Sequence, residues 1–336
     1  MRGYLNYTKH LITPADIQAV QRVLDSDRLT QGTEVHELEG EFAAKVGTKY
    51  AIAVSSGTAA LHLAYIAHGV TKGWTVVTSP ITFVATVSAA IYCGATVEFR
   101  DVGPETGRIK DGPQPVTENQ LFVPVHLGGS RATRDSTLPV VEDACHALGA
   151  GFDLEGTGCY SLHAAKQVAA GEGGIIATND YGVAQRCWVL RDHGRLKGEV
   201  VHLGYNYRMN EMSAALARSQ LERLDWSMEE RRRIAMRYVM GFKSKVRLVP
   251  RTDDSAHHLF QILVEDRARV MADLKEAGIG TQIHYKPVYE HPYYRDMEVI
   301  LPGAVEFSRK CLSIPMYPDL SEDDQDYVIE QVIKCI

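Results

Sequence analysis

Short apolar runs alternate with helical patterns through the first half of the 336-residue chain, and this alternation limits the folds available to it. Runs suited to buried strands lie at 50–54, 75–78, 96–99, 121–125, 139–142 and 174–178. Helical patterns follow two of them, at 58–67 and 83–92. Strands that alternate with helices predict an α/β domain whose mostly parallel sheet is covered on both faces. Ligands of such sheets bind where the carboxyl ends of the strands gather.

The pattern changes near residue 210. An apolar stripe with alternating spacings of three and four residues predicts one long helix over 210–238, on Ala214, Ala217, Leu221, Leu224 and Met228. Beyond it we expect strands at 246–249, 259–264 and 281–285, and a helix at 267–277 that ends at Gly278. These patterns predict a large α/β domain (1–210), a connecting helix (211–240) and a small α+β domain (241–336).

Composition narrows the classes of function. The net charge of −6 argues against a general nucleic-acid binder. The chain shows neither a signal-peptide pattern nor an apolar run of the length that crosses a bilayer. Its six cysteines are scattered, and His257, His258 and His284 have no partners at a zinc-ligand spacing. We therefore expect a cytoplasmic protein with reduced thiols, no metal site and no membrane partner.

Two segments at predicted strand ends carry candidate chemistry. Ser56, Gly57 and Thr58 follow the strand at 50–54 and open a helix, where small residues and the helix N-terminus favour an anion such as phosphate. The same residues also make a good helix cap. Asp143 follows the strand at 139–142. A carboxylate there can keep a pyridine nitrogen protonated, or it can simply cap the next turn.

Lys166 is the third candidate. It ends the segment SLHAAK (161–166), and a glycine-rich run follows at 171–174. The neighbourhood is small and weakly polar and has no adjacent carboxylate, so it would desolvate the ammonium and lower its pKa, as a Schiff-base lysine requires. Taken alone, a solvated surface lysine is the commoner case.

The order of the three segments is that of the aspartate-aminotransferase fold, fold type I of the pyridoxal-phosphate enzymes. The sequence resembles the DegT/DnrJ/EryC1/StrS family of sugar aminotransferases nearly end to end. The matching motifs are LTQG (29–32), SGTAAL (56–61), TFVAT (82–86), EDA with His146 (142–146), SLHAAK, and GYNYRMNE (204–211). Within the family, SLHAAK together with QIHYKPVY (282–289) resembles the pseudaminic-acid branch, which aminates C4 of a UDP-linked 4-keto-6-deoxy amino sugar.

The resemblance implies roles for the matching residues. Lys166 would hold pyridoxal 5'-phosphate as a Schiff base and shuttle protons, and Asp143 would pair with the pyridine nitrogen. The other implied cofactor contacts are Ser56, Gly57, Thr58 and Ser161 at the phosphate, Phe83 over the ring, His146 at the phenolic oxygen, and Asn206 from a partner chain. Candidate contacts of the sugar nucleotide are Tyr7, Thr30, Tyr285 and Lys286.

The implied activity is amino transfer from a donor, expected to be L-glutamate, to a nucleotide-linked 4-keto-6-deoxy sugar, with UDP the expected nucleotide. Asn206 implies a homodimer with shared active sites. Two alternatives stay open: a sugar dehydratase that uses the cofactor in its aldehyde or amine form, whose relatives carry histidine in place of Lys166, and a non-catalytic cofactor-binding regulator. The stretch at 102–139 and the loop at 151–158 are shorter than in the family, which we expect to change the pocket's shape and to remove no motif residue.

Overall fold

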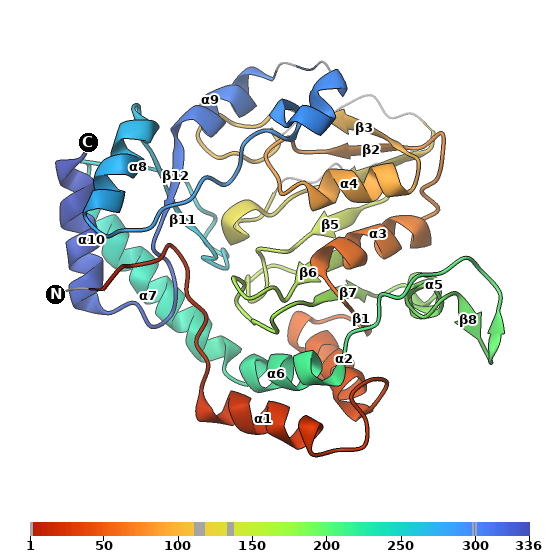
Figure 1. The fold of residues 1–336 in the computed structure, drawn as a ribbon. Coiled ribbons are helices and arrows are strands. Elements are labelled where there is room, and N and C mark those ends of the chain that lie inside the picture. The colour runs from red at the N-terminus through yellow and green to blue at the C-terminus, as the bar shows by residue number, and fades with distance from the viewer. Residues whose placement is uncertain (1–2, 111–117, 133–137, 298, 300) are drawn as a thin grey trace.

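The computed structural model describes residues 3–110, 118–132, 138–297, 299 and 301–336, and it confirms the expected α/β architecture (Figure 1). Strands β3 (Thr96–Phe99), β2 (Thr75–Thr78) and β4 (Gln120–Val123) form a parallel sheet. Strands β5 (Val141–Asp143), β6 (Thr157–Ser161), β7 (Gly174–Thr178) and β1 (Tyr50–Val54) form a second sheet. Parallel bridges, one of them from Val125 to Asp143, join the two into the continuous order β3-β2-β4-β5-β6-β7-β1. The joined sheet is mostly parallel, as expected, and β7 runs antiparallel to both of its neighbours.

Helices cover both faces of this sheet. Because successive side chains of a strand point to opposite faces, Ile52 joins a cluster with α3 (Gly57–Ala67), α4 (Ala85–Tyr92) and α5 (Tyr181–Arg191). Its neighbour Ala53 joins another cluster with α2 (Thr33–Val46) and α6 (Glu211–Leu221). Helix α1 (Pro14–Leu24) packs against α6. A hairpin of β8 (Arg195–Leu196) and β9 (Glu199–Val200) projects from the side of the domain (Figure 1).

The prediction of one long helix over 210–238 is wrong. Helix α6 ends at Leu221, and α7 (Leu224–Phe242) begins after a break at which Arg223 leaves helical geometry, with φ −106° and ψ 14°. The guanidinium of Arg223 turns to bind the carboxylate of Asp16 and the carbonyl of Leu11, and these contacts hold the break. The apolar stripe itself is buried as predicted, so the periodicity located the buried face and missed the interruption.

The C-terminal part forms a second layered unit. Strands β10 (Arg247–Leu248), β11 (Phe260–Leu263) and β12 (Cys311–Ile314) pair antiparallel, and α8 (Arg267–Glu276), α9 (Pro302–Lys310) and α10 (Glu322–Lys334) accompany them. One hydrophobic cluster unites residues of α7, α8, α10, β11 and β12 with Leu5 from the N-terminus. This cluster supports the proposed small domain over 241–336.

Two further differences from the sequence predictions concern strands. The strand predicted at 281–285 is wrong: only Gln282 pairs, by a single bridge to Ser313, and residues 282–285 line a cavity. Strand β6 was missed. Of the shortened stretch at 102–139, residues 111–117 and 133–137 lie outside the described residues. Short 3-10 helices of three residues each occur at Leu127–Gly129 and Val288–Glu290, and one of six residues occurs at Pro292–Met297. Within the described residues, no helix has both the length and the apolar character needed to span a membrane.

Candidate active site

A cavity of about 690 Å³ lies at the carboxyl ends of the strands, between the sheet and the C-terminal unit. It brings together most of the predicted site residues: Tyr7, Ser56, Gly57, Thr58, Phe83, Asp143, His146, Ser161, Lys166, Tyr285 and Lys286. Thr30 and Asn206 do not line it. Both are exposed, and they form isolated bridges to Asn210 and Asp192, respectively.

One end of the cavity is the first turn of α3. The Ser56 hydroxyl caps this helix by accepting the Ala59 N–H at 3.1 Å. A side chain at Gly57 would put its Cβ only 3.0 Å from the Cβ of Ser161 and 3.3 Å from the Cys145 sulfur. Glycine therefore lets the helix start approach the end of β6 without displacing Ser161 or Cys145. The first N–H groups of a helix have no partner within it, so this turn forms an anion cradle with Ser161 beside it.

Asp143 lies at the floor of the cavity and is 6% exposed. Its Oδ2 accepts a hydrogen bond from the Thr86 hydroxyl at 2.6 Å, and its Oδ1 accepts one from the Cys145 N–H at 3.2 Å. Since Thr86 donates to the carboxylate, Thr82 must donate to Thr86 across their 2.7 Å contact. Within the described part of the chain, the hydrogen bonds to this carboxylate come from neutral donors, which leaves its negative charge available to a cationic group in the cavity.

Lys166 reaches the cavity from a tightly closed loop. Its own N–H donates to the His163 carbonyl at 2.8 Å, and the Ala170 N–H donates to the Leu162 carbonyl at 2.8 Å, so the loop folds back on itself. Burial lowers the pKa of the Lys166 ammonium, and the nearby Cys145 and Asp143 oppose this shift. Loss of hydration thus favours the neutral amine, the form that attacks a carbonyl carbon.

Three histidines and a tyrosine form the opposite wall. His146 Nδ1 accepts the Gly128 N–H at 3.2 Å, so in the neutral ring the proton lies on Nε2, which is 3.1 Å from the Tyr285 hydroxyl. Burial, and secondly the charge of Lys166, hold the pKa of His146 far below its usual value. Burial also lowers the pKa of His284 to about 3 and that of His258 well below its usual range. All three rings are therefore neutral near pH 7.

Some residues that line the cavity or contact its groups were missed from the sequence. Thr86 stands in the TFVAT motif, four residues after Thr82, and that helical spacing was a usable signal for a hydrogen-bonded pair. Cys145 lies between two predicted site residues, yet nothing in the motif pointed to its contact with the backbone of β6. His258 was considered only as a metal ligand, and its place in the wall depends on long-range packing against His146.

Comparison with known proteins defines the class. Residues 10–333 match the model of the DegT/DnrJ/EryC1/StrS aminotransferase family. The chain belongs to this family of aminotransferases, as its motifs predicted. It is 36% identical to the spore coat polysaccharide biosynthesis protein SpsC of Bacillus subtilis, over 98% of this chain and 96% of that protein. The aligned 374 positions exceed the 336 residues, so at least 38 of them have no residue here.

Two solved structures extend the likeness to the fold. Helicobacter pylori PseC, an aminotransferase of pseudoaminic acid biosynthesis, superposes with a TM-score of 0.93 at 27% identity and 99% coverage of both chains. The PLP form of the sugar aminotransferase Spr1654 from Streptococcus pneumoniae gives 0.90 at 25% identity, over 99% of this chain and 98% of that one. These relatives favour the aminotransferase over the dehydratase and regulator alternatives.

Proposed function

We propose that this protein is a pyridoxal-phosphate-dependent transaminase that passes an amino group from an amino acid, expected to be L-glutamate, to a nucleotide-linked 4-keto-6-deoxy sugar. The observation that carries the proposal is the meeting of Lys166 and Asp143 in one cavity whose end is the α3 cradle. The names of SpsC and PseC, which concern polysaccharide and sugar-acid biosynthesis, support a sugar substrate. The six cysteines are all free, which supports a reducing compartment such as the cytoplasm.

The residues of the cavity fit the cofactor. The cradle formed by Ser56, Gly57, Thr58 and Ser161 suits its phosphate, and the carboxylate of Asp143 suits a protonated pyridine nitrogen, because that carboxylate has only neutral hydrogen-bond donors among the described residues. When bound, pyridoxal phosphate supplies an electron sink for the carbon that gains or loses a proton. Phe83, which is 58% exposed beside the cavity, presents a ring to cover the cofactor.

A few side chains of the protein would act directly in the reaction. Lys166 Nζ would hold the cofactor covalently and, once released by the incoming amine, would carry the proton between carbon atoms as a neutral base. Asp143 would keep the proton on the ring nitrogen. Tyr285 stays protonated, since burial raises the pKa of its hydroxyl. His146 orients that hydroxyl at the cavity wall, so Tyr285 is placed to share the phenolic-oxygen contact proposed for His146.

Lys286 is the proposed contact for the anionic parts of the substrates. With the wall histidines neutral, the lysine side chains that line the described part of the cavity are Lys166 and Lys286. Lys166 is committed to the cofactor, so the carboxylate of the donor and the diphosphate of the sugar nucleotide would both rely on Lys286 at the mouth. UDP is the proposed nucleotide, and Tyr7 would lie beside its sugar.

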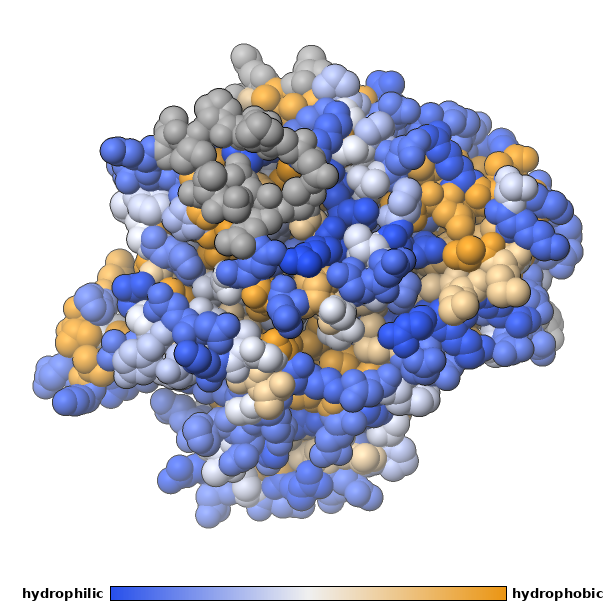
Figure 2. All heavy atoms as spheres, turned by 180° about the vertical axis from the view of Figure 1, so that it is seen from behind, coloured by the Kyte–Doolittle hydropathy of each residue, from blue (hydrophilic) through white to orange (hydrophobic). Residues whose placement is uncertain are grey.

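We also propose a homodimer with shared active sites. Asn206 does not line the cavity of its own chain, and it follows a projecting hairpin. The second strand of this hairpin and the residues after it expose apolar side chains, on the side of the molecule at the left of Figure 2. Leu203 is 88% exposed and Val200 69%. A second copy of the chain would cover these apolar side chains and receive Asn206 at its own cradle, which supports the role implied for that residue.

The test is covalent capture of the lysine. Purified protein loaded with pyridoxal phosphate should absorb visible light, and L-glutamate should bleach that band. Borohydride reduction followed by digestion and mass spectrometry should find the cofactor on the peptide that carries Lys166, and Lys166→Ala should give no labelled peptide. A band that no amino donor bleaches, or a label on another lysine, would refute the proposal.

A further inference from the structure

The N-terminal strap (residues 5–13) crosses from the C-terminal unit to α1 and forms part of the cavity wall. Its Leu5 N–H donates to the Gly278 carbonyl at 2.9 Å, and its Tyr7 carbonyl accepts from the Met316 N–H at 3.0 Å. Tyr7 and Thr8 line the cavity. Further along the strap, the Leu11 carbonyl accepts a hydrogen bond from Arg223 Nη2 at 2.8 Å. The position of Tyr7 therefore depends on what holds both ends of the strap.

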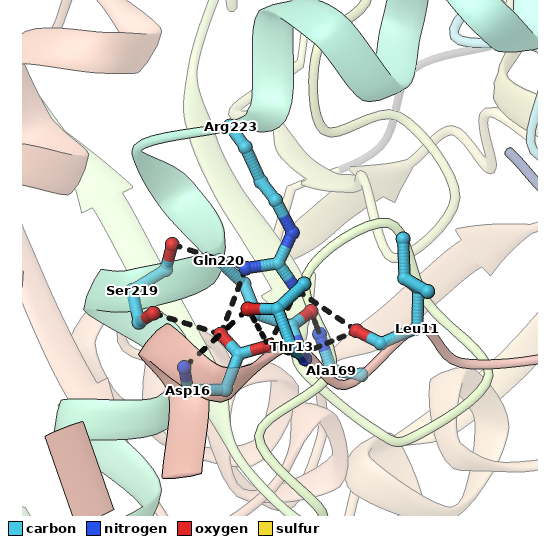
Figure 3. Close-up of polar contacts among 7 residues, drawn as sticks. All are labelled: Leu11, Thr13, Asp16, Ala169, Ser219, Gln220 and Arg223. Carbon is cyan, nitrogen blue, oxygen red and sulfur yellow. Dashed lines mark hydrogen bonds and ion pairs between the residues drawn. The ribbon is translucent and has the colours of Figure 1, made fainter. Parts of the chain in front are cut away.

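Gln220 joins the strap to the loop that carries Lys166 (Figure 3). Its Oε1 accepts the N–H of Ala169, three residues after Lys166, at 2.9 Å. Its Nε2 lies 3.5 Å from the Leu11 carbonyl. Gln220 is 5% exposed, so its amide has little water to replace these partners. One side chain thus touches both the lysine loop and the strap.

A buried ion pair fixes the strap at this junction. Arg223 donates through both terminal nitrogens to Asp16, at 2.8 and 2.7 Å, while it also holds Leu11. The Ser219 hydroxyl and the Thr13 N–H add hydrogen bonds to Asp16, which is 1% exposed. Burial opposes ionisation of Asp16, but the hydrogen bonds from Arg223, Thr13 and Ser219 outweigh it, and the pKa of Asp16 is lowered. The pair therefore remains charged at neutral pH.

We propose that Gln220, supported by Arg223, is a positioning residue that fixes the distance between Lys166 and the strap wall at Tyr7. The inference rests on the proposed role of Lys166. It follows from the geometry, because Gln220 contacts both the lysine loop and the strap, and Arg223 holds the strap beside it. If the link is lost, both segments loosen together, although neither Gln220 nor Arg223 lines the wall beside Tyr7.

The test compares Gln220→Met with a matched control. Methionine fills a similar volume and removes both hydrogen bonds. In the protein without substrate, amide hydrogen exchange should speed up roughly tenfold in both 5–13 and 162–170. The KM for the keto sugar should rise roughly tenfold as well. Arg218→Met is the control: it removes the ion pairs to Glu34 and Glu41 from the same helix and should leave exchange in both segments, and the KM, unchanged.

The variant Gln220→Glu distinguishes the contact with the lysine loop from the contact with the strap. A carboxylate still accepts the Ala169 N–H, so protection of the lysine loop should return, while the strap, which loses its amide donor, should stay loosened. Faster exchange in only one segment of Gln220→Met, or an equal rise in KM in Arg218→Met, would overturn the inference. A wild-type protein inactive on every keto sugar would instead refute the proposed function, since the exchange results do not depend on turnover.

Discussion

Replacement of Asp143 by asparagine tests the electrostatics of the site most directly. The change removes one negative charge and little volume. An asparagine oxygen can still accept the Thr86 hydroxyl, which lies 2.6 Å from Oδ2 in the wild type. The amide nitrogen then replaces the other carboxylate oxygen, and it presents hydrogens toward a ring nitrogen that should itself carry a proton. We expect the folded structure to persist and the cofactor's ring nitrogen to lose its counter-charge.

The size of the effect follows from the surroundings of the carboxylate. Removing one partner of a buried charge pair costs about 3–5 kcal/mol. Each factor of ten in rate corresponds to about 1.4 kcal/mol. We therefore expect kcat to fall roughly 150- to 4,000-fold in Asp143→Asn. Much of the loss should appear in the proton-transfer step, where the electron sink is needed.

Single-turnover kinetics with L-glutamate would measure this loss apart from sugar binding. Thr86→Val is the matched comparison, because it keeps the carboxylate and removes its 2.6 Å hydrogen bond. A charge-assisted hydrogen bond contributes about 1.5–3 kcal/mol, so this variant should lose roughly 10- to 100-fold. A rate in Asp143→Asn within threefold of the wild type, with the cofactor retained, would refute the assignment of Asp143 to the ring nitrogen.

Three further outcomes are expected. In the protein without cofactor, burial depresses the pKa of Lys166, so below the usual pKa of 10.5 the unfolded chain binds more protons than the folded protein. Lys166→Met should therefore be more stable than the wild type at pH 7 in thermal melts, and this difference in stability should shrink as the pH approaches 10.5. Leu203→Asp should weaken self-association at least tenfold in analytical ultracentrifugation while the circular dichroism stays unchanged, and an unaltered dimer would contradict the proposed contact through the apolar side chains of Val200 and Leu203. Burial keeps His146, His258 and His284 uncharged, with the pKa of His284 at about 3, so the NMR signals of these three rings should show no titration between pH 5 and 8. A titration of one of these three rings near 6.5 would mean that it is not desolvated.

The parts of the fold that the sequence predicted well are those with a local signal. Strand β1 and the turn after it combine a buried run with a helix cap at Ser56, and both features are visible within ten residues. The break between α6 and α7 has no such signal. It depends on Arg223 finding Asp16, which lies more than 200 residues away in the chain. The segment at 281–285 carries β-branched and aromatic residues that favour a strand, but it lines the cavity instead.

The residues of the candidate site also divide into those with a local sequence signal and those without one. Lys166 and Asp143 each belong to a short motif, so the sequence alone was enough to choose both, although it could not give their contacts. Neither Gln220 nor His258 stands in a motif from which its contact partner can be predicted. Their places are set by packing between segments more than 50 residues apart, Ala169 with Gln220 and His146 with His258. Thr30 and Asn206 do not line the chain's own cavity, so the roles implied for them stay predictions.

The difference in length from SpsC indicates which part of the fold the chemistry needs. At least 38 aligned positions of SpsC have no residue here, yet the cradle, the carboxylate and the lysine still meet. Those residues are attached to β1, β5, β6 and the loop before β7, whose pairing fixes their separation. From the described residues of 102–139, the cavity takes only Val125. The described residues of that stretch thus contribute little to the cavity lining, whereas the loop that carries Lys166 is tied to the sheet and, through the Ala169 N–H, to Gln220.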